Sequence, residues 1–391
     1  MNIRSLTAFL ARDALDETHF RALGDLVTAA RAALPIQTAR VALAAPPPLP
    51  LSDLMRWARD LYARCQARGI DYVSLGMLSD AARLEEIAPL LSATENVFAS
   101  AQIATRAREL DLGAIRRVAR VMRHLAETTP QGFGNLRFAA LANVPPHSPF
   151  FPAAYHDEGA PAFALATEAA SLAVAAFQNA ASLDAARAHL IQSIEQTSRT
   201  LVQVADELVA RSGFRFVGID FSLAPYPDAA RSIGAAIEHA LGAPLGNHGT
   251  LLATAVLTDC LQRARFPRTG FCGVMFPVLE DATLAARSPR LTLNDLLLYA
   301  SVCGTGLDTV PLPGDTSEDA LAAILLDLAA LAVKLNKPLT ARLMPIPGLS
   351  AGDMTSFDFE YFAPARVLAV HAQPLKIFDT DSHLRFVTQD E

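Results

Sequence analysis

Short apolar runs alternate with longer segments of helical periodicity along most of the 391-residue chain. In the longer segments apolar residues recur every three or four positions, whereas the short runs are almost continuously apolar. Continuous apolar runs are typical of parallel strands, which are buried on both faces. The pattern therefore predicts an α/β protein in which crossover helices join parallel strands.

The predicted elements fall into two halves around a helical stretch. In the first half, strands are predicted over residues 3–10, 37–44, 70–75, 96–104 and 133–143, and helices over 17–33, 51–67, 81–91 and 112–127. Residues 160–211 have a purely helical pattern, which predicts an insert of two long helices. In the second half, strands are predicted near 214–221, 270–277, 338–344 and 365–372, and helices over 228–241, 250–263, 292–301 and 319–335. No clear linker interrupts the chain, so we expect one large α/β domain over residues 1–391, with 160–211 as the insert.

Composition excludes several classes of protein. Hydrophobic residues make up 51% of the chain and charged residues 19%, which is far from the composition of a disordered chain. The formal net charge of -7 gives no general attraction to nucleic acid or to anionic lipid. We therefore expect a folded protein without a nucleic-acid or membrane partner.

The cysteines and the longest apolar segment bear on localisation. Cys65, Cys260, Cys272 and Cys303 are scattered and form no CxxC pair, which favours a reducing compartment over a disulfide-rich secreted module. The segment 320–333 is interrupted by Asp327 and is shorter than the roughly 20 residues that cross a bilayer. We predict a buried helix there and a cytoplasmic protein.

Candidate site residues are expected directly after each strand, because loops converge at the carboxyl ends of parallel strands. In an extended strand, Asn135, Arg137 and Asn143 lie on one face, so that Arg137 projects from an apolar strand. Its guanidinium suits a carboxylate, which belongs either to a substrate or to an internal ion pair. His156, after a proline-rich loop, is a candidate general base or metal ligand, although a lone histidine is more often structural.

Two further positions stand beside predicted strand or helix ends. Asp220 and Ser222 share one face at the end of a strand, where Asp220 could bind a cation, orient a histidine or simply accept backbone N–H groups. His248 lies in a glycine-flanked loop directly before the helix at 250, where backbone amides could bind an anion or merely start the helix.

The segment from Cys303 carries the densest set of candidates. Gly304 and Gly306 permit backbone torsions closed to other residues, which would expose the Cys303 thiol as a nucleophile, although free cysteines are usually buried. Asp308 and Asp315 follow as candidate ligands of a divalent cation. Arg342, on a later strand, is a second candidate for binding a substrate carboxylate.

Several long sequence segments of the chain resemble those of a known family. These are NLRFAALANVPPHSPFFPAAYH, DFSLAP, GFCGVMFPVLED, CGTGLDTVPLPGDT and RLMPIPGLSAGDMTSFDF. They are similar to the family called domain of unknown function seven hundred and eleven, whose fold is similar to that of pyruvate formate-lyase. The resemblance implies a ten-stranded α/β barrel made of two five-stranded parallel half-sheets, and it implies no particular activity.

Glycyl-radical enzymes of that fold transfer a radical between a loop cysteine and a glycine near the C-terminus. Cys303 resembles that cysteine only by its general position. The final glycine of the chain is Gly352, and Arg366-Val367 is followed by Leu-Ala-Val. Because the glycine that would store the radical is missing from this part of the chain, we predict a protein that does not use radical chemistry.

Taken together, these residues predict an enzyme that acts on a small anionic organic molecule inside the barrel. Arg137 or Arg342 would bind its carboxylate, and Cys303 would be the nucleophile or the acid/base thiol. His156, Asp220 and Asp308 would transfer protons or hold a divalent cation. Two alternatives are a ligand-binding or regulatory protein without turnover and a divalent-metal-dependent hydrolase. Alanine-rich helix faces also suit a homo-oligomer.

Overall fold

One large sheet organises the chain in the computed structural model, which describes residues 2–80, 83–379 and 382–386. Over these residues the sheet has 11 strands, with the order β8-β7-β1-β2-β3-β4-β6-β10-β9 and with β5 and β11 paired beside β4. The strands are β1 (Asn2–Leu10), β2 (Ile36–Leu43), β3 (Tyr72–Leu78), β4 (Val97–Ala104), β5 (Glu109–Asp111), β6 (Phe138–Ala142), β7 (Ala162–Glu168), β8 (Arg215–Asp220), β9 (Gly306–Pro313), β10 (Leu339–Ile346) and β11 (His383–Arg385). The predicted α/β class is therefore confirmed.

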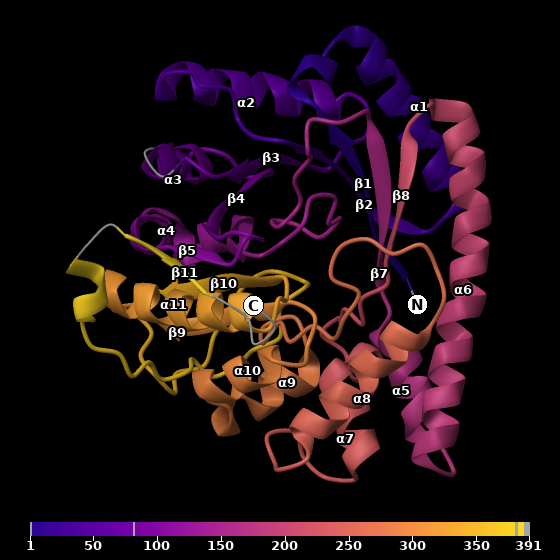
Figure 1. Ribbon diagram of the computed structural model, residues 1–391, viewed down its shortest axis with the longest axis vertical. Coiled ribbons are helices and arrows are strands. Elements are labelled where there is room, and N and C mark those ends of the chain that lie inside the picture. The colour runs from indigo at the N-terminus through magenta and orange to yellow at the C-terminus, as the bar shows by residue number, and fades with distance from the viewer. Residues whose placement is uncertain (1, 81–82, 380–381, 387–391) are drawn as a thin grey trace.

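Helices surround the sheet, and the long α6 runs along one side of the molecule (Figure 1). They are α1 (Glu17–Ala33), α2 (Leu51–Gln66), α3 (Leu84–Ser92), α4 (Leu112–Thr128), α5 (Ala170–Gln178), α6 (Leu183–Ser212), α7 (Ile233–Leu241), α8 (Thr250–Arg263), α9 (Ala282–Arg287), α10 (Leu293–Ala300) and α11 (Glu318–Lys334). Short 3-10 helices cover Arg12–Ala14, Pro130–Arg137, Ala229–Arg231, Ser288–Arg290 and Lys376–Asp379. The predicted and observed bounds of α1 agree, and the Asp16 side chain accepts from the His19 amide at its start. Residues 81–82 of the predicted helix 81–91 lie outside the described residues.

The strand directions divide the sheet into two parallel groups. Strands β1, β2, β3, β4 and β6 run parallel to one another and form the first group, and the parallel pairs β7 with β8 and β9 with β10 form the second. The two groups meet through antiparallel pairs, β1 with β7 and β6 with β10.

The ladder order is open, which corrects the expectation of a closed ten-stranded barrel. Its two ends are β8 and β9, and no ladder of the described residues joins them. Segment 268–277 lies between these ends: it makes isolated parallel bridges from Arg268 to Ile219, from Val274 to Leu223 and from Pro277 to Asp308.

Several predicted elements differ from the structure. Residues 162–168, predicted as helix, form β7 in the middle of the sheet, where every residue is buried. Alanine-rich sequence favours helix by local propensity, and pairing with β1 overrides it. Residues 130–137 are 3-10 helix, so the strand predicted from 133 begins at Phe138. Gly306, predicted to help expose the Cys303 thiol, begins strand β9. Predicted strands 270–277 and 365–372 form only isolated bridges.

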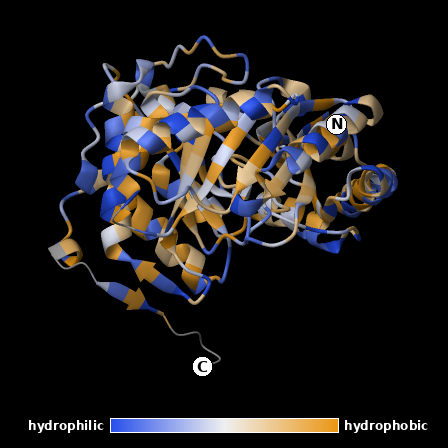
Figure 2. Ribbon diagram, turned by 90° about the horizontal axis from the view of Figure 1, so that it is seen from above, coloured by the Kyte–Doolittle hydropathy of each residue, from blue (hydrophilic) through white to orange (hydrophobic). Residues whose placement is uncertain are grey.

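The main core lies between the sheet and its helices, and a smaller cluster lies on the inner face of the curved sheet. Figure 2 shows largely hydrophobic strands enclosed by helices of mixed polarity. The inner cluster contains Phe9, Ala42, Phe98, Phe151, Ala154, Ala162 and Ala164. Two of these residues come from the loop between β6 and β7. Within the described residues, no helix is long and apolar enough to span a membrane.

The β6–β7 loop runs across the inner face of the sheet. Thr7 on β1 donates a hydrogen bond to the Pro149 carbonyl at 2.8 Å, and Ser74 on β3 donates to the Ala154 carbonyl at 2.9 Å. These buried hydroxyls satisfy loop carbonyls that would otherwise lack partners. The loop therefore brings Phe150 and Phe151 to a cavity at the centre of the molecule.

Candidate functional site

A central cavity of about 100 Å³ is lined by residues from strands that are distant in sequence. Since one water needs at least about 10–15 Å³ on this scale, the cavity has room for several waters or a small organic molecule. Aromatic rings form much of its wall: Tyr72, Phe98, Phe150, Phe151, Phe359 and Tyr361. Three arginines and two carboxylates complete the charged part: Arg4, Arg40, Arg342, Glu280 and Asp308. The lining thus carries an excess of one positive charge.

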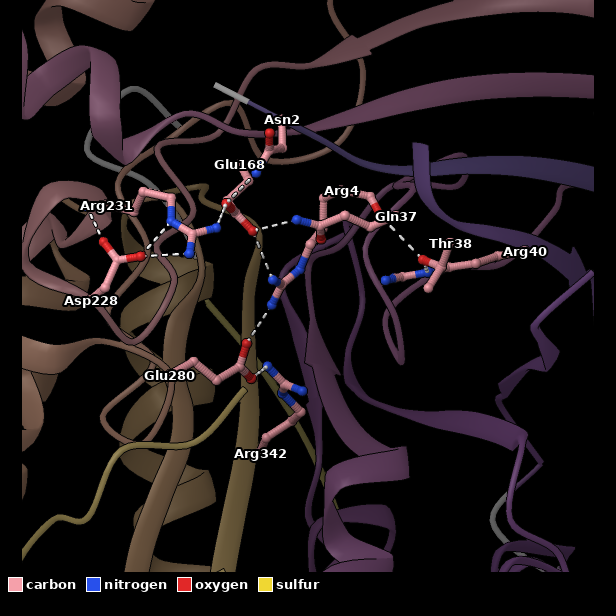
Figure 3. Close-up of polar contacts among 10 residues, drawn as sticks. All are labelled: Asn2, Arg4, Gln37, Thr38, Arg40, Glu168, Asp228, Arg231, Glu280 and Arg342. Carbon is pink, nitrogen blue, oxygen red and sulfur yellow. Dashed lines mark hydrogen bonds and ion pairs between the residues drawn. The ribbon is translucent and has the colours of Figure 1, made fainter. Parts of the chain in front are cut away.

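Alternating arginines and carboxylates form a continuous chain of ion pairs beside the cavity (Figure 3). The members, in order, are Arg342, Glu280, Arg4, Glu168, Arg231 and Asp228. Glu280 accepts from Arg342 and from Arg4, each at 2.8 Å. Every buried carboxylate in this chain therefore has at least one arginine partner, as burial of charge requires.

Glu168 is the most connected member of the chain. It is buried at the end of β7, and it receives hydrogen bonds from Asn2 at 3.1 Å, Gln37 at 2.8 Å, Arg4 at 3.1 Å and Arg231 at 3.2 Å. Four donors around one carboxylate hold β1, β2 and β7 in a defined arrangement. This geometry indicates that Glu168 has a structural role at the edge of the cavity.

Arg342 and Asp308 lie on the other side of the cavity, on adjacent strands β10 and β9. The Nε of Arg342 donates to Asp308 and its Nη2 donates to Glu280, so the guanidinium is shared by two carboxylates. These two partners raise the pKa of Arg342 above its usual range against the opposing effect of burial. Arg342 is therefore largely engaged by the protein itself.

Arg40 is the cation of the cavity with the fewest protein partners. Its side chain projects from β2, only 8% of the residue is exposed, and its Nε donates to Thr38 at 2.8 Å. Among the described residues, its two terminal nitrogens have no hydrogen-bond or ion-pair partner. Tyr72 and Phe151 lie over the guanidinium, with ring centroids 5.8 and 5.2 Å from its central carbon.

Burial and the two neighbouring arginines lower the pKa of Arg40, whereas Tyr72 and Glu280 act against them. Burial, together with the positive charges of Arg4 and Arg342, lowers the pKa of Arg40 to about 10. At neutral pH the group is still charged. A buried cation without a carboxylate partner costs free energy, and an anion in the cavity would lower that cost.

Two of the site residues predicted from sequence, Arg342 and Asp308, line this cavity. Arg137 is buried elsewhere and donates to the Thr94 carbonyl, and burial lowers its pKa to about 10. Asn135 donates to the Met122 carbonyl at 3.0 Å, and Asn143 to Asn336 at 3.3 Å. These three polar residues, predicted to share one face of a strand, instead contact three different segments of the chain.

Asp220 and Ser222 form a buried hydrogen-bond cluster with the turn at Gly270. Asp220 accepts from the Ser222 hydroxyl at 2.6 Å and from the amides of Phe271 and Cys272 at 2.7 and 2.9 Å. Burial raises the pKa of Asp220 to about 6 although these donors favour the charged form. The carboxylate thus does what the simpler interpretation expected, since it satisfies backbone N–H groups.

Cys303 lies beside a second, more open cavity of about 500 Å³, which Cys272, Gly304 and Lys337 also line. Cys303 is buried, and that burial raises the pKa of its thiol. Gly304 packs against Gly273, and Gly306 at the start of β9 has a φ of +100°. Gly304 therefore permits close packing of two backbone segments, and Gly306 permits the first residue of β9. The two glycines do not expose the Cys303 thiol.

The remaining predicted residues are also apart from the central cavity. His248 is exposed before α8, and Asp315 is exposed after β9. His156 is buried beside His147 at the base of the β6–β7 loop. The residues around 137, 156, 220 and 303 therefore do not meet Arg342 in a single cavity.

Sequence reasoning missed Arg4, Arg40, Glu168 and Glu280. A signal for Arg40 was present, because it is the charged residue inside the apolar strand predicted over 37–44. The argument applied to Arg137 applies equally to Arg40. The partners of Arg4 could not be found this way, because Glu168 and Glu280 are 164 and 276 positions away in sequence.

The fold and this cavity define an α/β protein with a buried, arginine-rich central site. A sequence-family comparison then identifies the particular group: residues 13–360 match the family described as Uncharacterised ACR (DUF711), and the chain belongs to that family. The predicted family resemblance is therefore confirmed.

Curated relatives carry the name UPF0210 protein. Those of Pyrobaculum arsenaticum and Methanosarcina acetivorans are 34% and 32% identical, and each match covers 70% of this chain and 62% of the relative. The relative from Acetivibrio thermocellus is 30% identical over 72% of this chain and 65% of its own length. The match thus spans less than two thirds of each relative.

Proposed function

We propose that this protein binds a small organic anion in the central cavity, with Arg40 as the main anchor. The observation that carries the proposal is a buried guanidinium that faces a cavity with both terminal nitrogens unpaired among the described residues. Arg4 and Arg342 reinforce the positive potential, although carboxylates of the protein already engage them.

The shape of the site favours a carboxylate with an apolar body. Because Nε of Arg40 is bound to Thr38, the free edge of the guanidinium is the pair of terminal nitrogens, which matches the two oxygens of a carboxylate. Phe98, Phe150 and Phe151 would contact the rest of such a ligand. The volume of about 100 Å³ suits a small acid and not a nucleotide.

Binding is better supported than any particular reaction. Cys303, His156 and Asp220, the predicted catalytic residues, are absent from the lining of the cavity, and its carboxylates Glu280 and Asp308 are both paired with arginines. Catalysis by Cys303 on a molecule held by Arg40 would require the two cavities to communicate. We therefore favour the ligand-binding function over the non-radical enzyme, which stays a prediction.

A direct test compares anion binding by the wild type and an Arg40→Lys variant. Calorimetry would use benzoate, isobutyrate and inorganic phosphate as probes, with Arg199→Lys on the exposed face of α6 as the matched control. The lysine keeps the charge and loses the planar fork, so carboxylate affinity should fall by about 10- to 100-fold, the worth of one or two charged hydrogen bonds. The control should bind like the wild type.

Two results would overturn the proposal. One is that none of the three probes binds to the wild type. The other is that Arg40→Lys and wild type bind the same carboxylate with equal affinity. Preference for phosphate over both carboxylates would contradict the assigned ligand class.

We also propose that the sheet is a variant of the ten-stranded barrel of pyruvate formate-lyase. Two parallel strand groups with antiparallel junctions support this, as do the bridges of segment 268–277 to both end strands. In this proposal segment 268–277 takes the place of the tenth strand.

The cytoplasmic location and a homo-oligomeric state are further proposals. The four cysteines are free, which supports a reducing environment. Exposed Leu252 and Leu298 on α8 and α10 support an apolar contact surface between copies. Sedimentation would test the second proposal.

A further inference from the structure

Two histidines and an aspartate converge at the base of the β6–β7 loop, and none of the three is among the residues that line the central cavity. His147 Nε2 lies 2.9 Å from His156 Nδ1, and Asp157 Oδ1 lies 3.2 Å from the first nitrogen and 3.3 Å from the second. Within the described part of the chain, these three residues form the cluster whose donor atoms could share one metal ion. Of the residues predicted as candidate cation ligands, His156 belongs to this cluster, whereas Asp308 and Asp315 do not.

The three separations fit the edges of a small coordination polyhedron. Zinc binds imidazole nitrogen and carboxylate oxygen at roughly 2.0–2.2 Å, so two ligands of a tetrahedral ion lie about 3.3 Å apart. Three donor atoms at 2.9–3.3 Å from one another can therefore surround one cation after shifts of a few tenths of an ångström. Two imidazoles with one carboxylate are a common donor set for divalent transition metals.

Neighbouring groups orient His156 for such a role. Its Nε2 lies 3.0 Å from the Gly159 carbonyl, so that this nitrogen carries the proton and Nδ1 presents its lone pair to the cluster. Burial lowers the pKa of both imidazoles, which favours the neutral form that binds metals. The Phe9 ring packs against both imidazoles, with centroids 5.1 and 6.2 Å away.

The cluster is open to solvent on one side, and it lies where the two ends of the β6–β7 loop meet. Asp157 is half-exposed, which leaves a route for a cation and a place for a water ligand. The His147 amide donates to the Tyr155 carbonyl at 2.9 Å, so the two histidines stand at the two ends of one closed loop. That loop carries Phe150 and Phe151 to the central cavity.

We propose that His147, His156 and Asp157 bind a divalent transition-metal cation of the zinc class, with water as a further ligand. The ion closes the base of the β6–β7 loop and thereby stabilises the wall of the central cavity. This site stands on its own residues and does not depend on the proposed anion function. The competing arrangement is a proton on His147 Nε2, shared between His156 and Asp157 with no metal.

The experiment loads the full chain, treated with chelator and dialysed, with Zn²⁺ alone and with Co²⁺ alone. Zinc affinity is measured by competition with a chromophoric chelator, and Co²⁺ reports the coordination geometry through its visible d–d bands. Asp157→Asn removes the half-exposed ligand, and His147→Gln removes an imidazole. Glu158→Gln is the matched control, because it removes an equally exposed carboxylate from the next position of the same loop.

Wild type and Glu158→Gln should each bind one equivalent of zinc and give a tetrahedral Co²⁺ spectrum. Asp157→Asn should bind zinc at least about 10-fold more weakly, since even outer-shell changes cost 10- to 100-fold. Zinc should also raise the melting temperature of the wild type more than that of Asp157→Asn. The proposal is overturned if the wild type binds no zinc, or if Asp157→Asn binds zinc as tightly as Glu158→Gln. If His147→Gln does not fold, Asp157→Asn alone still decides the test.

Discussion

Arg4 in the first strand donates through Nη2 to Oε2 of Glu280 at 2.8 Å, although 276 positions separate the two residues. The other oxygen of Glu280 accepts from Arg342 on β10. One buried carboxylate thus joins the first strand of the sheet to one of the last. The contact holds opposite walls of the central cavity in register, and it makes Glu280 a sensitive point for stability.

Replacing Glu280 with glutamine should destabilise the protein by about 1.5–3 kcal/mol, because Arg4 and Arg342 lose a shared charged acceptor although Glu168 and Asp308 still pair with them. Denaturant unfolding at neutral pH measures the change. Glu127→Gln, which removes an exposed partner of Arg123 on α4, should cost less than about 1 kcal/mol. If the two substitutions lower the unfolding free energy equally, the ion pairs of Glu280 contribute no more than an exposed ion pair, which would contradict this prediction.

Asp220 should make stability fall as pH rises through the weakly acidic range. Burial raises its pKa to about 6 in the folded protein, against 3.8 for an ordinary aspartate, so the folded state binds the proton more tightly. This contribution is complete below about pH 4 and is lost as pH rises to about 6. About two pKa units correspond to roughly 3 kcal/mol of unfolding free energy.

The measurement for Asp220 is the unfolding free energy of wild type minus that of Asp220→Asn at several pH values. This difference should decrease between about pH 4 and about 6, because the asparagine does not titrate. Asp206→Asn on α6 serves as the control for exposed aspartates. A difference that stays level or grows over this range would contradict the raised pKa.

Two glycine-to-alanine substitutions should act in opposite directions. A Cβ at Gly304 would lie 2.5 Å from the Cα of Gly273, so Gly304→Ala must push two backbone segments apart and should cost at least about 1–3 kcal/mol. Gly24 lies within α1 and meets only the flexible Arg68 side chain, at 3.1 Å. Gly24→Ala should stabilise the helix by about 0.5–1 kcal/mol. The melting temperatures of both variants, compared with the wild type, test these predictions. A Gly304→Ala protein as stable as the wild type would disprove the close packing.

The cysteines should react slowly with iodoacetamide in the native protein. Cys303 and Cys65 are buried, and burial raises the pKa of Cys65 and of the partly exposed Cys272 to about 12. At pH 8 only about one thiol in ten thousand with such a pKa is ionised, and the thiolate is the reactive form. Mass spectrometry of the native and unfolded protein gives the rates. Rapid labelling of native Cys303 would restore it as a candidate nucleophile.

Elements with strong local signals could be predicted from sequence. Helices α1 and α8 begin and end where their periodicity predicts, and the Asp16 side chain caps α1. Such boundaries depend on contacts within a few residues. Strand β7 depends instead on β1 and β8, which pair with it on its two sides, and its alanine-rich sequence has no local preference for a strand.

The sequence by itself determined that this chain is an α/β protein of one family, and it marked Arg342 and Asp308 as residues of interest. The tertiary structure alone decided that they share a cavity with Arg40, while Arg137, Asp220 and Cys303 are satisfied elsewhere. The physical reason is that the role of a buried charged residue depends on the groups that it contacts in the folded protein. The two carboxylate partners of Arg342 lie 34 and 62 positions away, and 276 positions separate Arg4 from Glu280, so no local pattern records these pairs.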